Sequence, residues 1–150
     1  MVRQLAWLVD EPAAVMLYAP LPTEVDVWPL VVARVNAGRE VGLPRIEADG
    51  LSVRLLTPGQ LTRGQLGIQE PDPDAPTIPV AVVVVPGLGF DPAGGRIGRG
   101  KGHYDRLLAR LPGVLTVGVG FDVQRVAEVP MSGHDVRLQR TVFGHTAEAG

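Results

Sequence analysis

The feature that most constrains the fold is a run of six apolar residues that leads directly into a glycine-rich segment. Residues 80–85 read VAVVVV, and seven of the nineteen glycines fall between Gly87 and Gly102. A continuous β-branched run is typical of a strand buried on both faces, as in a parallel sheet. The stretch GHYDRLLARL follows with helical apolar spacing, and Pro112 and Gly113 end it. We therefore expect a strand, a glycine loop and a helix, in that order.

The glycine-rich segment also has the composition of an anion site. Arg96, Arg99, Lys101 and Arg106 lie among or just after its glycines. Glycine lets backbone amides approach an anion, and nearby cations supply the charge that a polyphosphate demands. A loop between a strand and a helix is a usual place for such a site. The alternative interpretation is a tight crossing of the chain that binds nothing.

Strand and helix patterns alternate along the rest of the chain. Apolar runs predict strands at 14–18, 40–43 and 114–119, and an edge strand at 136–143. A helix is expected between the first two strands. Its start, its first turn and its end are marked by capping, acidic, proline and glycine residues, namely Thr23, Glu24, Asp26, Pro29 and Gly38.

A small antiparallel hairpin is expected beside these strands. Residues 46–48 and 51–56 flank Asp49-Gly50, a strong two-residue turn signal, whereas residues 60–79 are predicted to be mostly loop. Together the patterns predict one domain over residues 1–150 with an α/β fold. We expect a mainly parallel, open, Rossmann-like sheet in three layers, flanked by helices. Its ligand site should lie beyond the carboxyl ends of the strands.

Composition narrows the class of protein. The chain has 150 residues, 45% of them hydrophobic, enough for one core of ordinary size. Its formal net charge of −2 argues against nucleic acid or an anionic membrane as a partner, and no secretory signal pattern is present. The lack of cysteine fits a reducing compartment, so we expect a cytoplasmic protein with small-molecule substrates. The oligomeric state is left open.

Several common site motifs do not fit the chain. The run from Gly95 to Gly102 is close to a Walker A loop, but Gly102 stands where a Ser or Thr would ligate magnesium. The dinucleotide fingerprint fails because Pro92 occupies its third glycine position. No G-x-S-x-G elbow exists, and the three histidines lack the spacing of a zinc site.

A longer pattern is more specific. The segment PGLGFDPAGGRIGRGKGHYDRLL, from Pro86 to Leu108, resembles the signature of the 5-formyltetrahydrofolate cyclo-ligase family, also called methenyltetrahydrofolate synthetases. The resemblance includes LYAPLPTEVDVWPL, VGLPRI and GQLGIQEP upstream, and VP followed by HD near the end. It covers residues 14–136.

The resemblance implies a reaction and its parts. Members of this family use Mg-ATP to phosphorylate the formyl oxygen of 5-formyltetrahydrofolate, after which N10 attacks and phosphate leaves. Such chemistry needs a cationic cradle, a metal that bridges phosphates, and a pocket that holds the formyl oxygen in line. By similarity, the catalytic residues are Arg96, Lys101 and Tyr104. The residues implied to bind ATP are Arg96, Gly98, Arg99, Gly100, Lys101, Gly102, His103 and Tyr104.

The resemblance also implies the metal and folate contacts. Asp105 and Asp135 match the magnesium ligands, since hard oxygen ligands suit this ion. Glu24 matches a glutamate that accepts hydrogen bonds from the pterin. The folate would further be bordered by Arg99, Gly100, Lys101, Gly102 and His103. Each assignment has a structural alternative: a helix-start acid for Glu24, an exposed helix carboxylate for Asp105, and a turn residue for Asp135.

The chain departs from the family pattern near the same site. Members carry a further N-terminal helical segment with a Lys and Arg pair that reaches the ATP phosphates, whereas here Arg3 and Gln4 precede the first apolar segment. Four explanations are open. Arg3 replaces the missing Lys and Arg pair, another subunit supplies it, the start of the chain is truncated, or ATP binding is weakened. His103 replaces a usual tyrosine, and TVFGHTAEAG lacks the usual ending. The alternatives to a cyclo-ligase are therefore a non-catalytic nucleotide or folate binder, and a sugar-phosphate or acyl-transfer enzyme.

Overall fold

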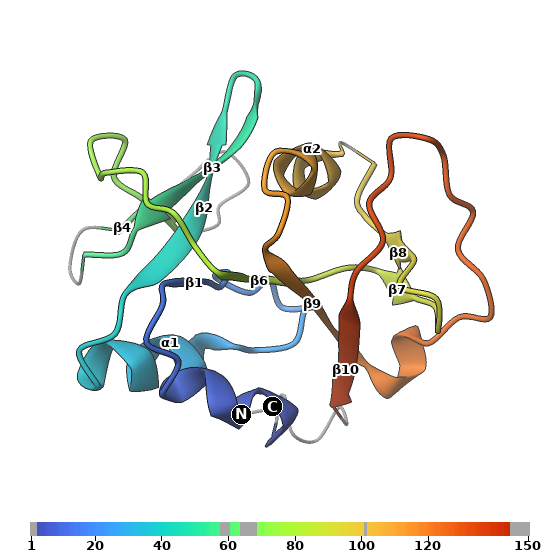
Figure 1. The fold of residues 1–150 in the computed structure, drawn as a ribbon, viewed down its shortest axis with the longest axis horizontal. Helices are drawn as coiled ribbons and strands as arrows, with labels where there is room; N and C mark the ends of the chain where they lie inside the picture. Colours follow the sequence, from blue (N-terminus) through green and yellow to red (C-terminus); the bar gives the residue numbers. More distant parts are fainter. Residues whose placement is uncertain (1–2, 58–60, 64–68, 101, 145–150) are drawn as a thin grey trace.

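The computed structural model describes residues 3–57, 61–63, 69–100 and 102–144 (Figure 1). Within these residues a six-stranded sheet has the order β10-β9-β6-β1-β2-β3. Its strands are β1 (Val15–Met16), β2 (Val41–Glu47), β3 (Gly50–Leu55), β6 (Val82–Val85), β9 (Leu115–Phe121) and β10 (Arg140–Gly144). Neighbouring strands are parallel except for the antiparallel pair β2 and β3. The predicted mainly parallel sheet with a small hairpin is confirmed.

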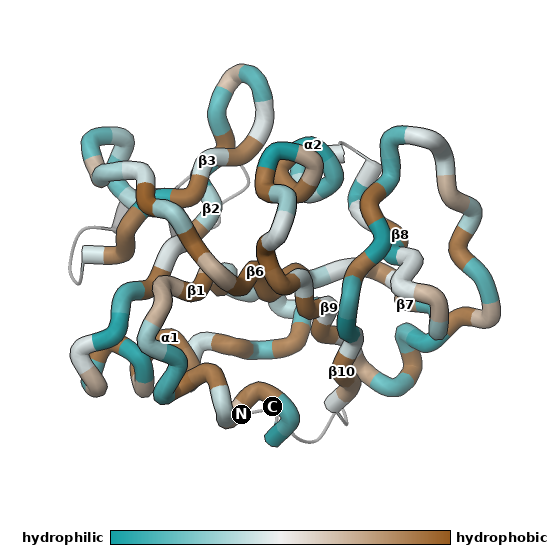
Figure 2. Tube along the Cα trace, viewed as in Figure 1, coloured by the Kyte–Doolittle hydropathy of each residue, from teal (hydrophilic) through white to brown (hydrophobic). Residues whose placement is uncertain are grey.

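Helices cover both faces of the sheet. Helix α2 (His103–Ala109) lies on one face, and α1 (Trp28–Asn36) and the 3-10 helix η1 (Arg3–Val9) lie on the other (Figure 1). Side chains of β6 alternate between the two cores: Val82 and Val84 pack toward α1 and η1, and their neighbours in sequence pack toward α2. The most hydrophobic stretches accordingly run through the central strands (Figure 2). The apolar run thus has the double burial that its sequence predicted.

Helix α1 begins later than the sequence indicated. Its first residue is Trp28, with Pro29 in the first turn, and the Asp26 carboxylate accepts the Trp28 N–H at 2.9 Å. Thr23 and Glu24 lie in a preceding turn, where Glu24 Oε1 accepts the Leu21 N–H at 2.8 Å. The expectation that they mark the start of the helix was wrong, because Pro29 fixes the first turn further along. Glu24 is left outside the helix.

The hairpin and the following loop also differ in detail. Glu47 pairs with Gly50, so the two turn residues are Ala48 and Asp49 instead of Asp49 and Gly50. Gly50 has φ +135°, a value that L side chains rarely adopt, and it already belongs to β3. Within residues 60–79, predicted mostly as loop, β4 (Leu61–Arg63) and β5 (Gln69–Pro71) form a short antiparallel ribbon.

Arg34, in the last turn of α1, is a buried cation that joins three segments. Its side chain is fully buried and donates to the backbone carbonyls of Leu8, Glu11, Ala13 and Glu40 at 2.6 to 2.9 Å. Burial lowers the pKa of this guanidinium, and Glu11 opposes that shift. These bonds fix η1 and the starts of β1 and β2 against the helix.

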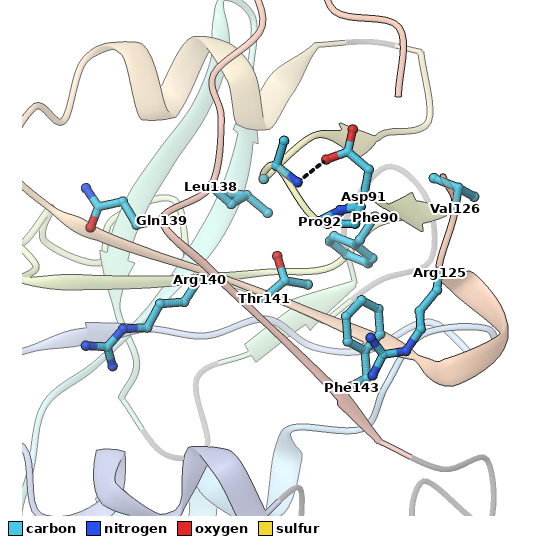
Figure 3. Close-up of a pocket in the computed structure, with 12 residues that line it drawn as sticks. Phe90, Asp91, Pro92, Arg125, Val126, Leu138, Gln139, Arg140, Thr141 and Phe143 are labelled. Atoms are coloured by element: carbon cyan, nitrogen blue, oxygen red, sulfur yellow. Dashed lines mark hydrogen bonds between the residues drawn. The ribbon is translucent and has the colours of Figure 1, made fainter. Parts of the chain in front are cut away.

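The glycine-rich segment contains a hairpin that the sequence did not reveal. Strands β7 (Gly89–Phe90) and β8 (Arg96–Ile97) pair antiparallel before the chain enters α2. Asp91 closes the loop between them: Oδ1 accepts the N–H of Ala93 at 2.9 Å (Figure 3). The same oxygen accepts the N–H of Gly95 at 2.8 Å. Oδ2 accepts the N–H of Val129 at 2.7 Å. One carboxylate therefore fastens this loop to a segment 38 residues away.

The predicted final strand is shorter than residues 136–143. Strand β10 begins at Arg140, because the preceding backbone bonds elsewhere: the Leu138 N–H donates to Gly94 O at 2.8 Å, and the Gln139 N–H to Thr116 Oγ1 at 2.9 Å. Helix α2 likewise ends at Ala109, two residues before Leu111. None of the described helices is long and apolar enough to span a membrane.

Candidate functional site

A cavity of about 550 Å³ opens where the strand order reverses. From β1 the chain goes to β2 on one side, and it later returns to β6 on the other side of β1. The residues just after these strands, Tyr18 and Ala19 after β1 and Pro86 and Gly87 after β6, line the cavity. Ligands of open α/β sheets bind in such a crevice. The predicted location of the site beyond the strand ends is therefore where this cavity lies.

The cavity brings together most of the residues that the sequence selected. Residues from three separate segments line it: Glu24, Arg96, Gly98, Arg99, Gly100, Gly102, His103, Tyr104, Asp105 and Asp135. Lys101 lies outside the described residues. The lining further includes Pro44, Ile46, Leu51 and Glu70 from β2, β3 and β5, and Val129 and Pro130 near the end of the chain.

Arg96 is the cation placed deepest beside the cavity. Its Nη1 donates to Pro86 O at 3.0 Å, and its guanidinium carbon lies 5.1 Å from the centre of the Tyr104 ring. A Cβ on Gly98 would lie 3.2 Å from both terminal nitrogens, so glycine there lets the backbone approach the cation. Burial lowers the pKa of Arg96 and raises that of Tyr104. The tyrosine is thus a neutral phenol at physiological pH.

Arg99 and Glu24 face each other across the cavity mouth. Arg99 Nη2 lies 3.1 Å from Thr23 Oγ1 and 3.8 Å from Glu24 Oε2. The Glu24 side chain is only 9% exposed, and burial raises its pKa, with the Leu21 N–H and Arg99 acting in the opposite direction. Tyr18, whose hydroxyl donates to Val25 O at 2.7 Å, is buried nearby. The cavity therefore has the buried carboxylate of Glu24 beside the more exposed guanidinium of Arg99.

Asp105 and Asp135 both line the cavity, and each brings a carboxylate to it. Asp105 Oδ1 accepts the Val136 N–H at 3.2 Å, and Asp135 Oδ2 accepts the Ser132 N–H at 2.8 Å. The described residues hold no cluster of three or more His, Asp or Glu side chains that would enclose a metal alone. Magnesium is normally bound by one or two carboxylates together with phosphates and water. The donor set fits that mode.

A second cavity, of about 400 Å³, lies beside β10 (Figure 3). Its polar side chains already have protein contacts: Asp91 accepts three backbone N–H groups, and Arg125 lies 3.7 Å over the Phe143 ring and pairs with Asp122. Phe90 and Phe143 meet edge to face inside it, with centroids 6.1 Å apart. None of the described site residues selected from the sequence lines this second cavity.

The model of the 5-formyltetrahydrofolate cyclo-ligase family matches residues 2–144. The chain belongs to this family. A protein named 5-formyltetrahydrofolate cyclo-ligase from Mycolicibacterium smegmatis is 35% identical over 83% of the chain and 70% of its own length. The protein of the same name from Escherichia coli K12 is 30% identical over 85% of the chain and 76% of its own. The chain is thus an enzyme of the ligase class, as its sequence predicted.

Solved structures agree with this membership. An NMR structure of Aquifex aeolicus 5,10-methenyltetrahydrofolate synthetase matches with a TM-score of 0.77 and 33% identity, over 94% of the chain and 73% of that protein. A synthetase of the same name from Mycoplasma pneumoniae matches with a TM-score of 0.69 and 21% identity, over 93% and 79%. The latter supports the fold alone. The cyclo-ligase fold is the three-layer arrangement described above.

Two polar side chains at the cavity of this cyclo-ligase family member, Tyr18 and Glu70, were not selected from the sequence. Tyr18 ends the first apolar run and reads as a core residue, and it is also at the cavity wall. Glu70 lies in a segment predicted as loop, where its acidic side chain reads as solvated. The sequence pointed to Glu70 only through the motif GQLGIQEP, which is part of the family resemblance but does not indicate what the glutamate contacts.

Proposed function

We propose that the chain uses ATP and Mg²⁺ to convert 5-formyltetrahydrofolate into 5,10-methenyltetrahydrofolate. The observation that carries the proposal is the convergence, in one cavity, of Glu24, the Arg96–Tyr104 loop and two aspartates from separate parts of the sequence. Family membership supports the same activity. The substrates are then small molecules, bound by a single domain over residues 1–150.

The reaction balances in two steps. First, the γ-phosphoryl group of ATP passes to the formyl oxygen of the folate, and ADP leaves. Then N10 attacks the formyl carbon and loses its proton, and the carbon–oxygen bond breaks to release inorganic phosphate. Phosphoryl transfer depends on positioning and on neutralising charge at the transferring group. The chain must therefore supply cations and an aligned folate, and it needs no covalent nucleophile.

Arg96, Arg99 and Lys101 are the cations proposed for the phosphates. Arg96 is preorganised by Pro86 O and the Tyr104 ring, so it need not be reoriented during the reaction. Backbone N–H groups of the glycine loop would donate to the same oxygens. Tyr104 is proposed to act as a hydrogen-bond donor, because its raised pKa keeps the phenol protonated. His103 borders the folate.

Two carboxylate roles complete the proposal. Glu24 would accept hydrogen bonds from the amino and ring N–H groups of the pterin, for which its burial removes competing water. Asp105 and Asp135 would hold Mg²⁺, which when bound supplies positive charge to the phosphate oxygens. Both carboxylates are oriented by backbone N–H groups, which leaves their side chains fixed at the cavity wall.

A near-ultraviolet absorbance time course tests the proposal. Wild-type protein with 5-formyltetrahydrofolate should form the methenyl product only when ATP and Mg²⁺ are both present. Asp105→Asn, which keeps an acceptor for the Val136 N–H, should reduce kcat/KM by about 100-fold or more. Asp122→Asn is the matched control, since Asp122 pairs with Arg125 outside the cavity. Absence of product from folded wild-type protein would reject the proposal.

A further inference from the structure

We infer that Glu70, positioned by Arg45, forms a second recognition point in this cavity for a flat, amino-substituted heteroaromatic ring. The inference rests on the proposed function, because that function supplies two substrates that each contain such a ring: the reduced pterin of the folate and the adenine of ATP. Glu24 is already proposed to face one ring. Glu70 adds a separate carboxylate on a different element of the same cavity.

Glu70 is desolvated at the cavity wall. It lies on β5, which packs against β2, and its side chain is only 5% exposed. Glutamate is rarely this buried unless its charge is paired. Nevertheless Glu70 lines the cavity with the apolar side chains of Pro44, Ile46 and Leu51. A buried acceptor in a mostly apolar wall is the arrangement by which pockets orient ligands.

Arg45, which does not line the cavity, contacts the Glu70 carboxylate. Its Nη1 donates to Glu70 Oε2 at 3.4 Å and to Pro71 O at 2.9 Å. Its Nε is buried and has no hydrogen-bond acceptor among the described residues; Glu47 Oε1 lies 4.0 Å away. A buried donor left unpaired is costly, and such groups gather at functional sites. Arg45 is thus a positioning residue that fixes the orientation of the Glu70 carboxylate.

Attachment of β5 to β2 does not by itself explain why residue 70 is a glutamate. The bond from Arg45 to Pro71 O already ties β5 to β2, and it is shorter than the bond to Glu70. A neutral side chain at position 70 would preserve that tie and would avoid the desolvation of a charge. The charge has a use if a ligand brings N–H donors, because an ionised carboxylate accepts two neighbouring donors at once.

Two carboxylate and arginine pairs of similar design therefore each present a carboxylate to the cavity. Glu24 with Arg99 and Glu70 with Arg45 each join a side chain less than 10% exposed to a guanidinium within 4 Å. The pterin edge presents an amino group beside a ring N–H, which are two neighbouring donors, whereas adenine presents its amino group beside ring nitrogens that only accept. An amino group on such a ring is the donor that each carboxylate fits. Which ring Glu70 takes is what the experiment distinguishes.

The test measures equilibrium binding by calorimetry with the full chain. The ligands are 5-formyltetrahydrofolate and a non-hydrolysable Mg-ATP analogue, and the variant is Glu70→Gln. One of the two dissociation constants should rise about 10- to 100-fold, as for loss of hydrogen bonds to a charged group, while the other stays unchanged. The rise should shrink when that ligand lacks its ring amino group. Glu47→Gln, on the neighbouring β2–β3 hairpin and not at the cavity wall, is the control and should bind like wild type.

The outcomes separate this inference from the proposed function. A selective loss of folate binding assigns Glu70 to the pterin, and a selective loss of nucleotide binding assigns it to adenine. If folded Glu70→Gln binds both ligands as wild type does, the inference about Glu70 is overturned. The proposed function is tested separately, by turnover of the wild-type protein. If Glu70→Gln does not fold, wild type is measured with a desamino folate and with an inosine nucleotide analogue. Affinities equal to those of both parent ligands would then overturn it.

Discussion

Asp91 is a single side chain on which one wall of the candidate site depends. Its three hydrogen bonds join the loop between β7 and β8 to Val129, which lines the cavity with Pro130. These bonds go to the ionised carboxylate, and they lower its pKa below the ordinary value of 3.8, the bond from Val129 most strongly. Protonation of Asp91 must therefore weaken the attachment of this wall.

This shift sets the direction of a pH dependence. Because the pKa of Asp91 is lower in the folded chain than in the unfolded chain, its stabilising contribution is complete above the unfolded value near 3.8. The contribution is lost as the pH falls from there through the lowered pKa. Asp91→Asn should be less stable than wild type at pH 7, and the difference should shrink toward pH 2. Urea unfolding followed by circular dichroism across this range measures it.

The pH prediction has a simple control. Asp74→Asn alters an aspartate in an exposed turn and should differ little in stability from wild type at pH 7. If Asp91→Asn differed from wild type by the same amount at every pH, the carboxylate charge would not be what holds the wall.

Single residues also show where sequence reasoning succeeds. Glu24, Arg96 and Arg99 were selected because two motifs that resemble the family pattern carry them, and they meet in one cavity. Arg34 and Asp91 were not selected, since their partners are carbonyl and N–H groups as far as 26 and 38 residues away. No local pattern specifies such partners. Fully buried polar side chains in a short helix or loop look like surface residues until the fold is known.

At the scale of elements, β9 is shaped to accept one aromatic ring. Its sequence LTVGVGF places Val117 and Val119 toward α1, while Gly118 and Gly120 leave room for Phe90. A Cβ on Gly120 would lie 2.8 Å from two carbons of that ring, closer than real contacts. The small hairpin β7–β8 is thus seated on the sheet through a groove that only glycine provides.

Gly120→Ala should therefore destabilise the fold through overpacking. The added methyl group must displace the Phe90 ring, at a cost of about 1–3 kcal/mol. For a chain of this size the melting temperature should fall by roughly 2–4 °C per kcal/mol. Gly133→Ala is the matched control, since nothing lies within 4 Å of a Cβ there, and its melting temperature should be near that of wild type. Differential scanning calorimetry compares the two; equal values would exclude the steric explanation.

The elements predicted from sequence are those with long apolar runs. β6, β9 and α2 were each recognised near their observed bounds. The β2–β3 hairpin was expected, but β2 is one strand through residues that were predicted as two, 40–43 and 46–48. β7 and β8 have two residues each, too few for a periodic pattern, and they form because Asp91 and the β9 glycines fix the loop. The turn of the hairpin moved by one residue because the pairing of β2 with β3 sets the register. Boundaries depend on tertiary contacts that propensity does not contain.

At the scale of the whole molecule, the strand order determines what the site can join. β1 and β6 are neighbours in the sheet but are separated in sequence by α1, β2, β3 and the β4–β5 ribbon. The cavity between their ends is consequently lined by segments from early, middle and late parts of the chain. A ligand in this cavity is expected to contact several of these segments, so its binding energy should oppose unfolding of the whole chain.

Binding should therefore raise the melting temperature, and each ligand should do so separately. At a free concentration about 100 times its dissociation constant, a ligand that binds only the folded chain adds about 2.7 kcal/mol to the free energy of unfolding. That corresponds to a rise of roughly 5–10 °C for a domain of this size. Glu24→Gln should lose most of the rise with 5-formyltetrahydrofolate, because its buried carboxylate is the proposed pterin acceptor. The same variant should keep the rise with Mg-ATP, whose proposed contacts lie on the glycine loop and the two aspartates.

A thermal shift measurement with each ligand alone checks both expectations. Equal loss with both ligands would mean that Glu24→Gln disturbs the cavity as a whole, and no loss with either would remove Glu24 from folate binding.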